Sequence, residues 1–184
     1  MRRAVFLDRD GVINRAVVRD GKPFPPRSVG ELEVLPDVRD ALRRLRDAGY
    51  VLIVVTNQPD VARGTQERSA VEQINDRLAS ELAIDDFLVC YHDDSANCAC
   101  RKPKPGGLLE AAMRHHVDLR SSYMVGDRWR DIEAGQRAGC TPFFIDYSYA
   151  ERQPAPPFER VHSLAEAAER IITQHSRRPD DSGQ

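Results

Sequence analysis

The chain has 184 residues, of which 41% are hydrophobic and 30% are charged, as is typical of one globular domain with a substantial core. Its formal net charge of −2 gives no electrostatic case for binding nucleic acid or an anionic membrane. We therefore predict a single domain over residues 1–175 and a flexible C-terminal tail over residues 176–184. Its partners should be small molecules.

The N-terminal segment does not resemble a signal peptide, because the apolar run Ala4 to Leu7 ends at Asp8 and is too short. No stretch of the sequence is long and apolar enough to span a bilayer. We therefore expect a cytoplasmic protein, and we expect a monomer. In a reducing compartment clustered cysteines are more often metal ligands than disulfides, whereas the isolated Cys140 fits a small buried apolar residue.

Apolar, strand-like runs alternate with amphipathic helical patterns along the chain. In chain order the predicted elements are a strand (4–7), a Pro- and Gly-rich loop (21–30), a helix (36–49), a strand (51–58), a helix (67–82), a strand (87–92), a helix (107–116), a strand (121–127), a helix (131–139), a strand (141–146) and a helix (163–175). This alternation predicts an α/β fold with a doubly wound, Rossmann-like parallel sheet.

Polar side chains stand at the ends of the predicted strands. Asp8 and Asp10 follow the first strand, Thr56 and Asn57 end the second, and Asp127 ends the fourth. Ligands of open parallel sheets bind beyond the carboxyl ends of the strands, so these residues should meet at one crevice. Asp and Gly also favour turns, and a single such motif would be better explained as a turn. Three motifs at successive strand ends favour a functional site.

The segment CYHDDSANCAC contains three of the four cysteines of the chain. Residues i and i+2 of an extended chain point to the same side, so Cys90 with His92 and Cys98 with Cys100 form two chelating pairs. Together they predict a closed, tetrahedral structural Zn²⁺ site in a zinc-binding loop. The alternative is a reduced, partly buried cysteine cluster. A zinc ion here would fix the two cations that follow directly in the sequence, Arg101 and Lys102.

Four motifs resemble those of the haloacid dehalogenase superfamily of phosphohydrolases. They are FLDRDGVIN, VVTNQ, the lysine of RKPKPG, and VGDRWRDIEAG, in this order, and the resemblance covers the chain from about Phe6 to Asp146. The resemblance extends to a capless subgroup that contains the D,D-heptose bisphosphate phosphatases and the histidinol-phosphatase domain. It implies a haloacid dehalogenase-like fold without a large cap domain, and a phosphatase that acts on a small phosphorylated metabolite.

Phosphoryl transfer gives roles to the acidic residues. We predict that Asp8 is the nucleophile and that Asp10 is the general acid and base, acting through an aspartyl-phosphate intermediate. A carboxylate that attacks an anionic phosphate ester needs its charge neutralised. A Mg²⁺ ion shared by Asp8, Asp127 and the backbone carbonyl near Asp10 would do this.

Other residues are predicted to bind the phosphoryl group and the rest of the substrate. Thr56, the amides around Asn57, and Lys102 should contact the transferring oxygens. Asp131, one helical turn after Asp127, should hold Lys102 or a metal-bound water, unless it is a solvated carboxylate of a first helical turn. Three arginines are candidates for further substrate contacts, namely Arg63, Arg101 and Arg128.

The resemblance implies a sugar phosphate as substrate, with removal of the 7-phosphate of D-glycero-D-manno-heptose 1,7-bisphosphate as the first candidate reaction. The alternative is histidinol phosphate, because the zinc loop has only five residues between its ligand pairs, as in the histidinol-phosphatase domain. Two readings from other classes remain. A phosphoacceptor receiver domain would carry its aspartate where VVTNQ stands, and an inactive zinc-stabilised interaction module would not need Asp8, Asp10, Lys102 and Asp127.

Overall fold

A computed structural model describes residues 1–176 as an α/β fold built on a six-stranded sheet. All strands of this sheet are parallel, in the order β5-β4-β1-β6-β7-β8. They are β1 (Arg3–Leu7), β4 (Tyr50–Asn57), β5 (Asp86–Cys90), β6 (Tyr123–Gly126), β7 (Thr141–Ile145) and β8 (Glu159–Val161). The chain starts in the middle of the sheet and winds outward in both directions, which confirms the predicted doubly wound architecture.

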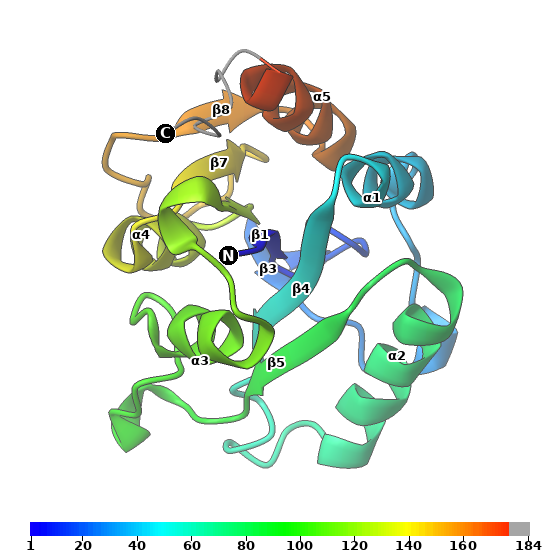
Figure 1. The fold of residues 1–184 in the computed structure, drawn as a ribbon. Helices are drawn as coiled ribbons and strands as arrows, with labels where there is room; N and C mark the ends of the chain where they lie inside the picture. The colour runs from blue at the N-terminus through cyan, green and yellow to red at the C-terminus, as the bar shows by residue number, and fades with distance from the viewer. Residues whose placement is uncertain (177–184) are drawn as a thin grey trace.

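Helices cover both faces of the sheet (Figure 1). One face packs against α1 (Val38–Asp47), α2 (Arg68–Glu81) and α5 (Leu164–Ser176), and the other against α3 (Gly106–His115) and α4 (Trp129–Ala138). Three short 3₁₀ turns lie in the connections, η1 (Val29–Glu31), η2 (Asp94–Ala96) and η3 (Leu119–Ser121). The first residue of the predicted tail, Ser176, closes α5, and residues 177–184 lie outside the described part of the chain.

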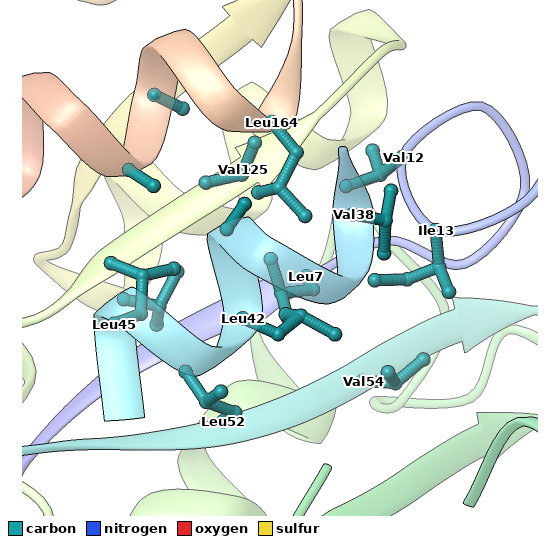
Figure 2. Packing of buried hydrophobic residues seen from close by; sticks show 14 of the residues in the cluster. Leu7, Val12, Ile13, Val38, Leu42, Leu45, Leu52, Val54, Val125 and Leu164 are labelled. Atoms are coloured by element: carbon teal, nitrogen blue, oxygen red, sulfur yellow. The ribbon is translucent and has the colours of Figure 1, made fainter. Parts of the chain in front are cut away.

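The core consists of two layers because successive side chains of a strand point to opposite faces. In β1, Val5 and Leu7 join the layer under α1, whereas the alternate residues Ala4 and Phe6 join the layer under α3 and α4. Helix α1 contributes Val38, Leu42 and Leu45, which point toward the sheet at helical spacing (Figure 2). Each fully buried leucine of this kind contributes about 1.5–3 kcal/mol of hydrophobic stabilisation. The ends of the central strands are thereby held rigidly.

A two-stranded hairpin replaces the first part of the predicted loop. Its strands are β2 (Val17–Arg19) and β3 (Lys22–Phe24), which pair antiparallel. Asp20 and Gly21, with φ of 49° and 71°, form the two-residue turn. An Asp-Gly pair between short strands is a strong hairpin signal, because both positions of such a turn require positive φ. The prediction of a loop gave too much weight to the prolines and too little to this dipeptide.

The edge strand β8 was not predicted from the sequence. It has only three residues, Glu159 to Val161, and only Val161 is buried. Short charged edge strands carry little hydrophobic periodicity. Among residues 1–176, no helix is long and apolar enough to cross a membrane.

Candidate active site

An open pocket of about 200 Å³ lies at the carboxyl edge of the sheet. The ends of β1 and β4 supply Asp8, Asp10 and Thr56 to its lining, and Lys102 reaches it from the loop that precedes α3. The hairpin forms one wall through the segment Lys22 to Pro25. The side chains that the sequence placed at successive strand ends therefore meet in space.

Three buried carboxylates lie together at this edge, those of Asp8, Asp127 and Asp131. One oxygen of each lies within 4.8 Å of the others. Both side-chain oxygens of Asp127 are buried without a hydrogen-bond partner among residues 1–176. Burial raises the pKa of Asp127 well above its ordinary value, and burial followed by repulsion from Asp131 raises the pKa of Asp8 to about 6. An oxygen-only donor set in which the Asp127 oxygens have no partner fits a hard cation such as Mg²⁺.

The carboxylate of Asp10, a residue predicted to contact the metal only through its backbone carbonyl, is not part of this acidic group. Its oxygens accept hydrogen bonds from Arg9, Asn14 and Gln58 instead. A metal contact through the backbone carbonyl of Asp10, as predicted, requires no side-chain oxygen and stays a prediction.

Lys102 is fully buried and links two of the carboxylates. Its Nζ lies 2.9 Å from Asp8 Oδ1 and 2.6 Å from Asp131 Oδ1, and it donates to the Val55 carbonyl at 2.7 Å. Burial alone would lower the pKa of Lys102, but the charges of Asp131 and Asp8 outweigh it and raise the pKa. The predicted contact between Asp131 and Lys102 is thus confirmed, and the lysine is held charged beside Asp8.

Asn57 holds Lys102 in place through its main chain. The Asn57 side chain donates to the Lys102 carbonyl at 3.0 Å and accepts from the Lys102 amide at 3.1 Å. Both ends of the Asn57 amide are therefore engaged, although the residue also lines the pocket. Its predicted contact with the transferring oxygens would therefore have to come from backbone amides around Asn57.

Two glycines let the acidic residues approach the backbone. Gly11 has φ of 89°, and a Cβ atom there would lie 1.9 Å from Asp127 Oδ2. A Cβ on Gly126 would lie 2.1 Å from the Cβ of Asp131. Neither position can hold a larger residue without moving an acidic side chain. These contacts explain the glycines that directly follow Asp10 and precede Asp127.

Four arginines surround the mouth of the pocket, and three of them contact one carboxylate, that of Asp94 in η2. Asp94 lies 3.0 Å from Arg101, 3.3 Å from Arg130 and 4.0 Å from Arg63. Arg63 and Arg130 line the pocket, whereas Arg101 is buried beside it and does not. Arg130 was not among the predicted substrate contacts, although it stands within the motif VGDRWRDIEAG.

The fourth arginine, Arg128, lines the pocket and pairs with a different carboxylate. Its guanidinium forms a two-point ion pair with Glu151, with Nε 2.9 Å from the carboxylate. Glu151 also lines the pocket and was not identified from the sequence. The fork of Arg128 is therefore already occupied by a protein carboxylate, and its predicted substrate contact stays a prediction.

The four predicted zinc ligands converge. The Cys100 sulfur lies 3.1 Å from Cys90 Sγ, 3.4 Å from Cys98 Sγ and 3.4 Å from His92 Nδ1. All four ligand atoms lie within 4.8 Å of one another. Ligands about 2.3 Å from a central tetrahedral ion would be separated by roughly these distances. The donor set therefore fits Zn²⁺, and its last ligand immediately precedes Arg101 and Lys102.

Known proteins resemble this chain along nearly its whole length. Residues 26–139, more than half of the chain, match the profile of the haloacid dehalogenase-like hydrolases. The D-glycero-beta-D-manno-heptose-1,7-bisphosphate 7-phosphatase of Bordetella bronchiseptica is 34% identical over 182 residues, covering 94% of this chain and 99% of the relative. The enzyme of the same name from Escherichia coli is 37% identical over 147 residues, covering 73% and 74%.

A solved structure agrees with the sequence comparison. D,D-heptose 1,7-bisphosphate phosphatase from B. bronchiseptica, crystallised with magnesium and phosphate, matches with a TM-score of 0.81 and 31% identity, covering 94% of this chain and 99% of that one. The chain belongs to the haloacid dehalogenase-like hydrolase family.

Proposed function

We propose that this enzyme is a Mg²⁺-dependent phosphatase that removes the 7-phosphate of D-glycero-D-manno-heptose 1,7-bisphosphate. The observation that carries the proposal is the acidic group of Asp8, Asp127 and Asp131 with Lys102 beside it, at the base of a pocket with a cationic mouth. The names of the relatives that are 34% and 37% identical support the choice of substrate.

The chemistry is assigned to the residues at the bottom of the pocket. Asp8 attacks phosphorus and forms an aspartyl-phosphate, while Asp10 gives a proton to the leaving alkoxide oxygen. Asp10 then takes a proton from the water that hydrolyses the intermediate. Mg²⁺, held by Asp8, Asp127 and the backbone carbonyl of Asp10, would offset the negative charge that meets at phosphorus.

Two further groups are assigned to the transferring phosphoryl oxygens. The Lys102 ammonium, 2.9 Å from Asp8, is close enough to contact an oxygen of a phosphoryl group bound to that residue. The Thr56 hydroxyl lines the same part of the pocket and can donate a hydrogen bond. We assign to both the role of stabilising charge that develops in the transition state.

The arginines at the mouth support a substrate with a second anionic group. Arg63, Arg101 and Arg130 meet at the carboxylate of Asp94, and Arg63 also pairs with Asp60, so three guanidinium groups face two carboxylates there. A guanidinium prefers a bidentate oxyanion such as phosphate. We therefore assign the 1-phosphate of the substrate to this cluster, which lies at the mouth while the 7-phosphate reaches Asp8.

We propose a structural zinc ion bound by Cys90, His92, Cys98 and Cys100, which would hold the loop that carries Arg101 and Lys102. We also propose that one domain, residues 1–175, carries the whole activity as a monomer. The proposed catalytic groups Asp8, Lys102 and Asp127 all come from a single chain, so chemistry requires no second copy.

A phosphate-release assay on a panel of esters tests the proposed function. With Mg²⁺ present, heptose 1,7-bisphosphate should give a kcat/KM at least about tenfold above that for histidinol phosphate, about 1.4 kcal/mol of transition-state discrimination. Omitting Mg²⁺ from zinc-loaded protein should abolish release. A preference for histidinol phosphate would favour the alternative substrate, and no release from any ester would favour a receiver domain or an inactive module.

A second test follows from the acidic group itself. The pKa of Asp8 rises from its ordinary value of 3.8 to about 6 on folding, so the folded protein takes up a proton in this window. The contribution of Asp8 to the stability of the metal-free protein should therefore fall as the pH rises from about 4 to about 6. Mg²⁺ binds the ionised form, so saturating Mg²⁺ should raise Tm by about 5 °C or more at about pH 7.5 and by less than half of this at about pH 5.

Scanning calorimetry of zinc-loaded protein measures these shifts. Asp127→Asn serves as the control, because it removes a ligand without changing the shape of the side chain, and it should lose most of the Mg²⁺-dependent shift. A shift that is equal at both pH values, or that is retained in the control, would place the Mg²⁺ site elsewhere.

A further inference from the structure

The Asp10 carboxylate is held on both of its oxygens by buried side chains. Oδ1 accepts from Arg9 Nε at 3.2 Å, from Arg9 Nη2 at 3.1 Å and from Asn14 at 3.0 Å. Oδ2 accepts from Arg9 Nη2 at 3.1 Å and from Gln58 Nε2 at 2.8 Å. Only 15% of the Asp10 side chain is exposed. The carboxylate therefore has a fixed plane and a fixed direction, which hydrogen bonds from three residues define.

Arg9 has no solvent-exposed surface, which is unusual for an arginine. Besides Asp10, its guanidinium donates to Asn75 Oδ1 at 2.9 Å, on the buried side of α2. The guanidinium fork thus connects the carboxylate to a helix on the face of the sheet. A planar, bidentate contact of this kind restricts rotation of the carboxylate more than a single hydrogen bond does.

Gln58 connects Asp10 to Thr56. It is 1% exposed, and its Nε2 donates one hydrogen to Asp10 Oδ2 at 2.8 Å and the other to Thr56 Oγ1 at 2.9 Å. An ionised carboxylate only accepts hydrogen bonds, so the amide nitrogen must face Asp10. The Thr56 oxygen then accepts from Gln58, and its own hydrogen is left to point toward the pocket.

We propose that Arg9 and Gln58 are positioning residues for the hydrolytic reaction. Arg9 sets the orientation of Asp10 for proton transfer, and Gln58 fixes Asp10 and the Thr56 hydroxyl relative to each other. The inference rests on the proposed function, in which Asp10 exchanges protons with the leaving group and with water. Neither residue touches the substrate, so each acts only through the groups that it holds.

The role of Arg9 predicts a dependence on the leaving group. A poor alkyl leaving group needs a proton from Asp10, whereas 4-nitrophenolate leaves without one. Arg9→Met should lower kcat about 10²-fold on an alkyl phosphate, the loss that misplacement of a catalytic group typically causes, with KM within about twofold. The loss in kcat/KM, which does not include hydrolysis of the intermediate, should be at least about fivefold smaller on 4-nitrophenyl phosphate.

A double-mutant cycle separates positioning from a general effect on folding. In an Asp10→Asn background, Arg9→Met should cause no further loss, because the group that it positions is gone. Gln58→Met should lose activity in both backgrounds, because it also releases Thr56. Arg9→Lys, which keeps the charge but lacks the fork, should not restore kcat. Arg68→Met, which removes an exposed ion pair with Glu72 on α2, is the control and should leave kcat unchanged.

The outcomes distinguish the inference from the function on which it rests. If Asp10→Asn itself leaves alkyl phosphate hydrolysis unchanged, the proposed role of Asp10 fails. If Asp10→Asn is strongly impaired but Arg9→Met lowers kcat/KM on both esters equally, Arg9 has only a structural role. The same conclusion follows if Arg9→Met adds its full loss to that of Asp10→Asn. Wild-type kcat in Arg9→Lys would also overturn the proposal. Should Arg9→Met fail to fold, Gln58→Met with normal kcat on the alkyl ester would overturn it independently.

Discussion

Asp8→Asn is expected to lower kcat at least about 10⁴-fold, because an amide cannot replace the carboxylate as nucleophile. The fold should remain intact. Asp8 Oδ1 accepts from the Arg9 amide at 2.8 Å and lies 2.9 Å from Lys102 Nζ, and an asparagine oxygen can accept from both. Steady-state phosphate release and calorimetry together measure the two effects.

Stability provides an internal check on this variant. Burial and the neighbouring Asp131 disfavour the ionised form of Asp8, whose pKa is raised to about 6. A neutral side chain removes this repulsion, so the metal-free Asp8→Asn protein should have a Tm at neutral pH at least equal to that of the parent. Asp40→Asn, on the exposed side of α1, is the matched control and should keep full turnover. Turnover of Asp8→Asn within tenfold of the parent would contradict the assignment.

Cys98→Ser is expected to lose about one equivalent of zinc and to lower kcat/KM about 10²–10³-fold, the effect of losing a positioned charge at a phosphoryl group. Thiolates bind zinc more tightly than hydroxyl groups do. Without the ion, the segment after Cys100 should no longer hold Arg101 and Lys102 in place, so KM should rise while kcat falls. Elemental analysis of protein purified without chelators and steady-state kinetics with Mg²⁺ measure both effects.

The zinc site also contacts Gln58, the residue that holds Asp10 and Thr56. The carbonyl of Cys90 accepts from the backbone amide of Gln58 at 2.7 Å. Cys140→Ser is the matched control, because this buried cysteine is not among the clustered ligands and its loss should leave zinc content and KM unchanged. Full activity of a zinc-free Cys98→Ser protein would overturn the structural role. Full activity of zinc-loaded protein without Mg²⁺ would overturn the division between the two metals.

The catalytic edge could be predicted from the sequence because its signals are local. Each polar motif directly follows a short β-branched or apolar run, and parallel strands bring their carboxyl ends to one edge. The zinc ligands were predictable for the same reason, since the spacing of Cys90, His92, Cys98 and Cys100 determines which atoms can meet. The positions of these residues depend little on the rest of the fold.

The connections between charged side chains could not be predicted. Arg9 stands in the most recognisable motif of the chain, yet its pairing with Asn75 joins residues that are 66 positions apart. Arg130 and Asp94 meet over 36 positions, and both are of types that are usually solvated. Such pairs depend on how α2, α4 and the zinc loop pack, and residue spacing carries no information about that packing.

The hairpin that walls the pocket has consequences for how the substrate range of this fold can change. None of its six strand residues is buried. Val18 is 54% exposed and Phe24 is 37% exposed. Substitutions at exposed positions typically change stability by only about 0.5 kcal/mol. The segment Lys22 to Pro25 can therefore vary in shape and charge while the acidic group beneath it stays intact. Substitutions in the hairpin can in this way alter which molecule enters the pocket without disturbing the groups that cleave it. Proteins with the same catalytic motifs can therefore diverge in specificity through this hairpin.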